Sequence, residues 1–294
     1  GLPLEACTVE LYTNRDLLRD IGVSIPVSQQ FSPAGFVDMV QKARARNITP
    51  MALGVGDRPF PGAHLTHEAL LKRLGVVDYG RLLRGQIKFG DERVVATLRW
   101  LKSVIDQGLL PSSFTSLKLG EAHTYFHTSP RAVSFLNGSW YTSRAFNAPD
   151  KGGQPVNFPL GIMKFPDVPN SADNEAKTMA VGGSYVVNAA TKRPQQAIAF
   201  LNTLATPEMG NLWLENVLVQ TGIKSDASKI AGPHAGYFKM LADVNAKASY
   251  AFGLPSQVLQ GKARDAFTQI FNVGFPSGTI SVDDAVKQMT AALA

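Results

Sequence analysis

Two histidines, His64 and His67, have the spacing in this sequence that comes nearest to a reactive site. Residues three apart share one face of a helix, so these two imidazoles could bind one metal ion. No third ligand accompanies them, and histidines in a protein core or in contact with solvent often have the same spacing. We therefore expect no metal site at this position.

The sequence also lacks the motifs of the common catalytic sites. It contains no Gly-x-Ser-x-Gly turn, no Gly-x-x-x-x-Gly-Lys loop and no His-Glu-x-x-His motif. Gly54-Val55-Gly56 lacks the third glycine of a dinucleotide-binding loop, so we interpret it as a turn. Two carboxylates about 5 to 10 Å apart, as in glycosidases, are an arrangement that the sequence leaves open. We expect a protein that is not an enzyme and uses no cofactor.

Composition limits the class of protein further. The chain has 294 residues, 45% hydrophobic and 18% charged, which is typical of a soluble globular protein with one large domain or two ordinary ones. The formal net charge is +6, but acidic residues interrupt the basic ones, so we expect no nucleic-acid partner. Cys7 is the only cysteine, which excludes an internal disulfide. No apolar run approaches the roughly 20 residues that span a bilayer.

Helical and strand patterns alternate along the chain, which predicts an α/β fold. Capping residues predict helices that begin after Ser32, Asp91, Thr206 and Ser281. Since the strands are short and mostly separated by helices, we expect a mixed, largely parallel sheet. The predicted strands are 8–12, 50–54, 132–136, 158–163 and 184–188, and the predicted surface loops are 147–154 and 167–177.

The order of several motifs resembles that of the family 1 extracellular solute-binding proteins, the maltose-type, carbohydrate-binding receptors of ATP-binding cassette importers. The similarity extends over essentially the whole chain. The segments that carry it are Gly1-Leu2-Pro3-Leu4-Glu5, residues 11–18 and 21–26, residues 45–53, Leu83-Arg84-Gly85-Gln86, Asn137-Gly138-Ser139-Trp140, Gly182-Gly183 with Tyr185-Val186-Val187, residues 197–204, and Thr206-Pro207-Glu208.

The resemblance implies a two-lobed periplasmic-binding-protein fold with a ligand cleft and a hinge. It assigns residues 1–6 and 183–231 to the N-terminal lobe, most of which, roughly 100 residues, is expected to be missing from this chain. Residues 7–182 and 232–294 are assigned to the C-terminal lobe. The implied receptor is a periplasmic or lipid-anchored monomer that captures a sugar or oligosaccharide and delivers it to membrane permease subunits. A signal peptide is not present in this sequence.

A sugar site needs flat aromatic faces together with carboxylate, amide and arginine side chains. Trp140 follows a Gly-Ser turn after a predicted strand, and its ring can face a cleft, where the resemblance also places it. Trp100 and Trp213 lie in apolar helical stripes and are expected in the core. The resemblance adds Glu5 on the segment between the lobes, and Arg58 and Phe60 on a loop that lines the cleft.

The remaining candidates are glycines and tyrosines close to these segments. Gly182 and Gly183 are expected near the hinge, either because the ligand approaches the backbone or because their φ angles are positive. Tyr141 and Tyr185 are ligand-binding candidates by proximity. Two other functions stay open: a receptor of the same fold for an anionic molecule such as a glycerophosphodiester, which Arg58 would bind, and a glycoside-processing enzyme.

Overall fold

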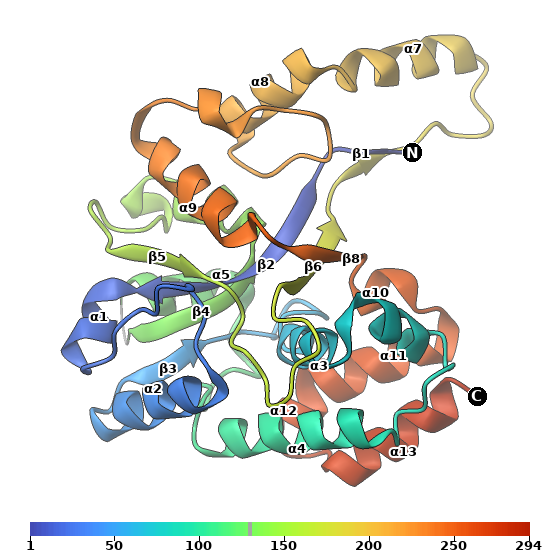
Figure 1. Cartoon of the computed structure of the whole chain (residues 1–294). Helices are drawn as coiled ribbons and strands as arrows, with labels where there is room; N and C mark the ends of the chain where they lie inside the picture. Colours follow the sequence, from blue (N-terminus) through green and yellow to red (C-terminus); the bar gives the residue numbers. More distant parts are fainter. Residues whose placement is uncertain (129–130) are drawn as a thin grey trace.

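The computed structural model describes residues 1–128 and 131–294 (Figure 1). Its strands are β1 (Leu2–Pro3), β2 (Ala6–Asn14), β3 (Thr49–Ala52), β4 (Ala132–Gly138), β5 (Leu160–Met163), β6 (Ala176–Val181), β7 (Ser184–Tyr185) and β8 (Ser249–Phe252). The main sheet has the order β3-β4-β2-β6-β8, and β5 also pairs with β2. The small pair β1 and β7 forms a separate sheet.

The expectation of a largely parallel sheet is wrong. Strand β2 pairs antiparallel with β4, β5 and β6, whereas β3 with β4 and β6 with β8 are the parallel pairs. Neither β6 nor β8 is among the predicted strands, and β6 begins inside the predicted loop 167–177. Strand direction depends on which distant segments pair, and the local pattern of residues does not contain this information.

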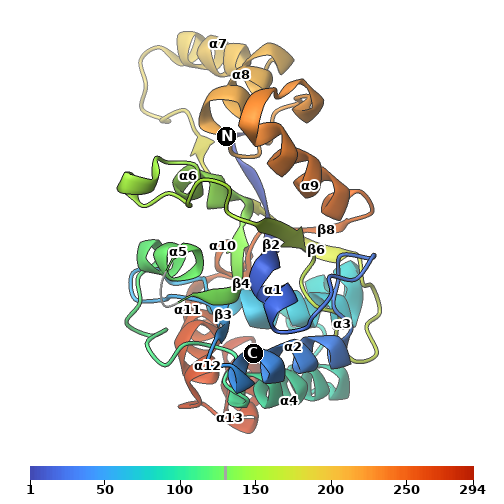
Figure 2. The same cartoon turned by 90° about the vertical axis from the view of Figure 1, so that its left-hand side faces the viewer.

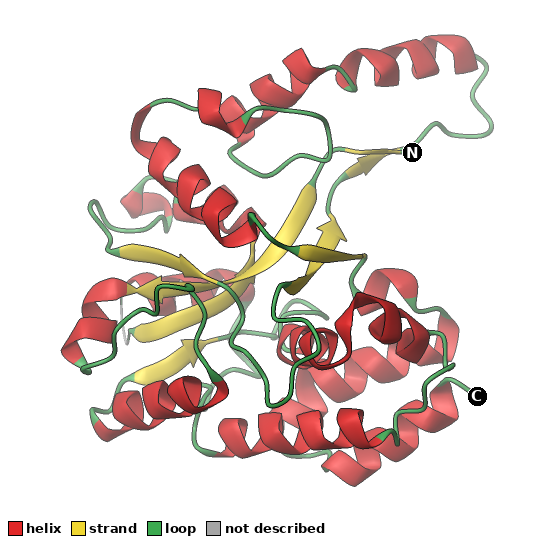
Figure 3. Cartoon of the chain, viewed as in Figure 1, coloured by secondary structure: helices red, strands yellow, loops and turns green. Residues whose placement is uncertain are grey.

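Helices cover both faces of the main sheet (Figure 3). They are α1 (Arg15–Asp20), α2 (Pro33–Ala45), α3 (Ala63–Leu83), α4 (Glu92–Asp106), α5 (Leu119–His127), α6 (Thr142–Ala145), α7 (Pro194–Leu204), α8 (Pro207–Val217), α9 (Ala235–Asn245), α10 (Pro255–Val258), α11 (Gly261–Thr268), α12 (Phe275–Ser277) and α13 (Val282–Ala292). The expected N-caps of α2, α4, α8 and α13 are confirmed, since each of their side chains accepts a hydrogen bond from a first-turn N–H.

Alternation along the strands divides the buried residues between two cores. Leu11 and Leu136 point into a core that includes α2, α3, α4, α11 and α13. Tyr12 and Phe135, next to them in the sequence, point to the other face, into a core that includes α5 and α9. Because both faces are covered, β2 is buried along almost its whole length.

Helices α7 and α8 lie at the end of the molecule where the N-terminus lies, and α2, α4 and α13 lie at the other end (Figure 2). No residue of α7 is buried, and its apolar residues Ile198 and Phe200 are 51% and 59% exposed. Among the described helices, none has the length and apolar character required to cross a membrane.

Candidate functional site

Five of the predicted site residues line one cavity of about 380 Å³. The cavity lies where β2, β6, α5, α6 and α10 approach the loop that follows β3. Its lining residues are Glu5, Arg58, Phe60, Leu119, His123, Trp140, Ser143, Arg144, Ala180, Val181, Gly182, Leu254 and Gln257. The predicted residues among them are Glu5, Arg58, Phe60, Trp140 and Gly182. Their contact with a ligand stays a prediction.

Trp140 and Phe60 form an aromatic wall of this cavity. Their ring centroids are 5.8 Å apart with the rings perpendicular, and the His64 ring lies behind, 6.0 Å from Trp140. Trp140 is in the 3₁₀ turn η1 (Ser139–Tyr141), and its indole folds back over Gly138. A Cβ atom at position 138 would be 2.0 Å from the indole, so glycine is required before this tryptophan.

The backbone that carries Arg58 and Phe60 is held from a distant helix. Asn272, which is buried in the π-helical segment η5 (Gln269–Gly274), accepts a hydrogen bond from Gly62 N–H at 2.9 Å. The same amide donates to the Arg58 carbonyl at 3.1 Å. The Arg58 side chain has Asp57 nearby, with 3.9 Å between Nε and Oδ2. Both ends of this loop segment are therefore anchored.

Glu5 occupies the point where β1 leads into β2. Its Oε2 accepts a hydrogen bond from Gly183 N–H at 2.9 Å. A Cβ atom at position 182 would be 2.2 Å from the same oxygen, so Gly182 leaves the space that the carboxylate fills. Neither glycine has a positive φ. Close approach of the Glu5 side chain explains the glycine at 182, whereas a Cβ atom at position 183 would make only ordinary contact, 3.6 Å from Glu5 Cδ.

Two tyrosine candidates do not line the cavity. Tyr141 is fully buried, is stacked on Tyr12 at 4.1 Å, and has its hydroxyl 2.7 Å from His127 Nε2. Successive residues of a 3₁₀ turn point about 120° apart, so Trp140 faces the cavity while Tyr141 faces the core. Tyr185 is 49% exposed on β7, where it pairs with Leu2. Gly183 contacts Glu5 but is also outside the lining.

The other two tryptophans are only partly buried. Trp100 packs against the core that contains α4, as expected, whereas Trp213 on α8 keeps part of its surface exposed.

Sequence reasoning missed Ser143, Arg144, His123 and Gln257 as lining residues. For Arg144 a signal existed, because it follows Trp140 by four residues at the start of a helix. For His123 and Gln257 no local pattern indicated proximity to the cavity.

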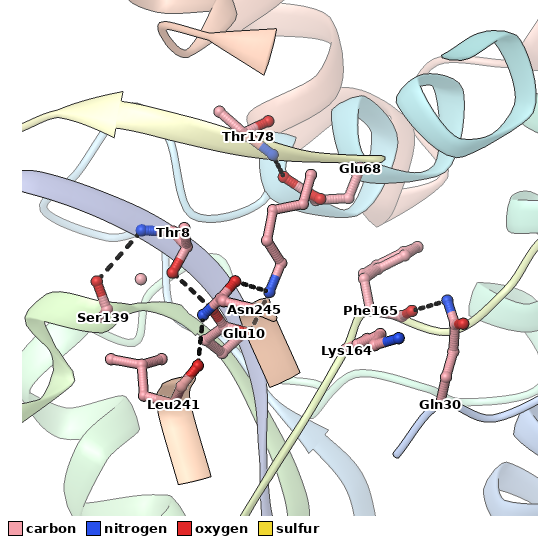
Figure 4. A network of polar contacts seen from close by, with 12 residues as sticks. Thr8, Glu10, Gln30, Glu68, Ser139, Lys164, Phe165, Thr178, Leu241 and Asn245 are labelled. Carbon is pink, nitrogen blue, oxygen red and sulfur yellow. Dashed lines mark hydrogen bonds and ion pairs between the residues drawn. The ribbon is translucent and has the colours of Figure 1, made fainter. Parts of the chain in front are cut away.

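A buried polar network supports the strands behind the site (Figure 4). Lys177 Nζ is 2.6 Å from Glu10 Oε2 and 2.8 Å from Asn245 Oδ1. Glu10 also accepts from Thr8 Oγ1 at 2.6 Å and from Asn245 Nδ2 at 3.1 Å. Lys177, which the sequence placed in a surface loop, is 2% exposed, because β6 is an inner strand of the sheet.

The histidine pair is part of the packing between α3 and β6. His64 Nδ1 is 2.8 Å from His67 Nε2, and His67 Nδ1 is 3.2 Å from Thr178 Oγ1. Burial lowers the pKa of His64 to about 3, and that of His67 also falls well below its usual value. Burial raises the pKa of the neighbouring Glu68 to about 7. Within residues 1–128 and 131–294 no group of three or more side chains is arranged to hold a metal ion.

No protein-family model and no curated protein matches this sequence. Solved structures do match its fold. A protein studied for xylan utilization by the thermophilic bacterium Caldanaerobius polysaccharolyticus has a TM-score of 0.84 and 20% identity, with 99% of this chain and 72% of that chain covered. A chitin oligosaccharide binding protein has a TM-score of 0.82 and 23% identity, with 100% and 70% covered. A family 1 extracellular solute-binding protein from Bifidobacterium longum subsp. infantis has a TM-score of 0.70 and 16% identity, with 99% and 72% covered.

Proposed function

We propose that this chain, which has the fold of extracellular solute-binding proteins, is the substrate-binding component of an ATP-binding cassette importer and captures a sugar or oligosaccharide. The observation that carries the proposal is the cavity itself, in which an aromatic wall of Trp140 and Phe60 lies with the Glu5 carboxylate and the Gln257 amide. Such a wall covers the C–H face of a sugar ring, and the polar groups bind its hydroxyls. The chitin oligosaccharide binding protein with this fold supports the choice of ligand.

The receptor we propose has two lobes with the ligand between them. Residues 1–6 and 183–231 belong to one lobe, and residues 7–182 and 232–294 to the other. The separation of the β1–β7 sheet from the main sheet supports this division. The exposed Ile198 and Phe200 on α7 would pack against further residues of the first lobe. Hinge motion at the crossing strands β2 and β6 would then close the cleft.

The receptor would act as a monomer outside the cytoplasmic membrane, deliver its ligand to permease subunits, and catalyse no reaction. A thermal-shift screen of the protein against a carbohydrate library tests this role. A ligand present at about 100 times its dissociation constant should add about 2.7 kcal/mol to the free energy of unfolding. The same carbohydrates should be recovered unchanged after incubation. Hydrolysis by the pure protein, or a screen without any stabilising carbohydrate, would contradict the proposal.

Replacing Trp140 with alanine should weaken sugar binding by roughly 2 to 4 kcal/mol, as truncation of an anchoring aromatic side chain does. Isothermal titration calorimetry measures the loss. The matched control is Trp100→Ala, which removes a tryptophan packed against the core of α4 and away from the cavity. That variant should lose stability and keep its affinity. If Trp140→Ala unfolds the protein while binding survives, Trp140 is a core residue and the site is misplaced.

A further inference from the structure

Arg144 is a cavity residue whose charge has no counterion within residues 1–128 and 131–294. It lines the cavity one helical turn after Trp140, and no carboxylate oxygen among the described residues lies within 4.0 Å of its guanidinium. The guanidinium instead lies over Gly120 in the first turn of α5, since a Cβ atom there would be 2.6 Å from Nη1. The positive end of a helix dipole does not stabilise a cation. Arg144 is exposed at this position, so its charge is solvated and an anion from outside the chain can reach it.

The other charges of the cavity do not supply that anion. Arg58 is a second guanidinium in the lining, and Glu5 is its single carboxylate. One oxygen of Glu5 is already bonded to Gly183 N–H. Asp57 is near Arg58, and its Oδ1 also accepts from Leu119 N–H at 2.8 Å. With Arg58 beside Asp57, Arg144 is the lining guanidinium that has no carboxylate beside it among the described residues, and neutral hydroxyl groups do not require such a charge.

His123 is a buried histidine of the same lining. Its Nε2 is 3.2 Å from Asn137 Nδ2, and an amide nitrogen only donates, so the proton of the neutral imidazole is on Nδ1. This Nδ1 is buried and has no hydrogen-bond partner among the residues that the structure describes. His123 is 2% exposed and lines the cavity. A buried donor without a partner is costly, so this imidazole leaves an unsatisfied polar group beside the cavity.

We propose that the ligand is an acidic sugar, in which a carboxylate on the ring binds Arg144 while the ring stacks on the wall of Trp140 and Phe60. This inference rests on the proposed function and specifies its substrate class. A guanidinium matches a carboxylate with two parallel hydrogen bonds, which a neutral hydroxymethyl group cannot provide. Arg58 adds long-range attraction to the same anion.

Calorimetric titration with a uronate-containing oligosaccharide and with its neutral counterpart, in which each carboxylate is replaced by a hydroxymethyl group, tests the inference. The acidic sugar should bind about ten to a hundred times more tightly, the range expected for hydrogen bonds to a charged group. This preference should shrink as salt is raised from about 50 mM to about 500 mM, because ions screen the attraction. Equal affinities, or a preference for the neutral sugar, would overturn the inference.

Arg144→Met removes the charge and keeps an unbranched apolar stem. The variant should lose the preference for the acidic sugar, because its affinity for the acidic sugar should fall much more than its affinity for the neutral one. The control Arg99→Met changes an exposed arginine far from the lining, beside Asp283, and should keep the preference. A preference that survives in Arg144→Met would contradict the assignment. Inorganic phosphate that binds as tightly as the acidic sugar would show a simple anion site, and failure of both sugars to bind would instead refute the proposed function.

Discussion

Acidification from about pH 7 to about pH 5 is expected to lower the free energy of unfolding by an amount on the order of 5 kcal/mol. Four buried histidines cause the loss. Burial lowers the pKa of His64 and His123 to about 3 and that of His127 to about 4, and His67 also has a pKa well below 6.5. Below about pH 6.5 the unfolded chain binds protons that the folded chain does not, so stability falls by about 1.4 kcal/mol per pH unit for each histidine.

Glu68 opposes this trend. Burial raises its pKa from 4.5 to about 7, so the folded state holds a proton that the unfolded state releases above about pH 4.5. Its contribution to stability therefore grows as the pH falls from 7 towards 4.5, and it offsets the loss from about one histidine. The net effect remains a loss, because four histidines act in the opposite direction.

Urea unfolding at several pH values measures this slope. The control is His234→Gln, which replaces the one histidine that is only partly buried, stacked on Phe146. It should change the slope little, whereas His127→Gln should reduce it by about a third, because Glu68 already offsets one of the four histidines. A free energy of unfolding that stays constant between pH 7 and pH 5 would mean that these imidazoles are solvated or charged in the folded protein.

Replacing Lys177 with methionine is expected to cost about 3 to 5 kcal/mol of stability, because it leaves the Glu10 carboxylate buried without a cation. Both side chains are almost completely inaccessible, at 2% and 0% exposure. The double variant Glu10→Gln, Lys177→Met removes both charges and should recover much of the loss. Measured together with Glu10→Gln alone, it completes a double-mutant cycle in urea.

A surface ion pair provides the matched control. Lys239 Nζ is 3.0 Å from Asp243 Oδ2, and both side chains are exposed. Lys239→Met should therefore cost less than about 1 kcal/mol. If Lys177→Met costs no more than Lys239→Met, solvent reaches Glu10 and the network in Figure 4 does not order the sheet.

Local signals in the sequence predicted the elements whose ends carry their own hydrogen-bond partners. Ser32 and Asp91 begin helices as expected, because a capping side chain acts within four residues of itself. Strand β6 could not be predicted in the same way. Its start follows a polar loop, and in the sequence Lys177 has the character of a surface residue. Its burial depends on the ion pair with Glu10, which is 167 positions away in the sequence.

The residues of the candidate site also fall into those that the sequence indicates and those that only tertiary packing brings to the cavity. Trp140, Phe60, Arg58 and Glu5 belong to motifs that could be found by resemblance, and the structure brings them to one cavity. His123 has no distinguishing neighbours in the sequence. Its position depends on the packing of α5 against β4, which places its ring 4.9 Å from that of Phe135. Tyr141 and Trp140 are neighbours in the same 3₁₀ turn, and their side chains point in different directions. The type of a residue does not determine which of these directions its side chain takes.

The π-helical segment η5 acts as a one-residue insertion in the register of its helix. An α-helix over the same stretch would hold one residue fewer and would turn Asn272 about 100° away from the loop it binds. The carbonyl of Asn272 also leaves no room for a side chain at position 62, since a Cβ atom there would be 2.0 Å away. The π-helical insertion in η5 therefore requires glycine at position 62, and the two features depend on each other. A homologue that lacks one should lack the other, and the loop with Arg58 and Phe60 would then take a different path.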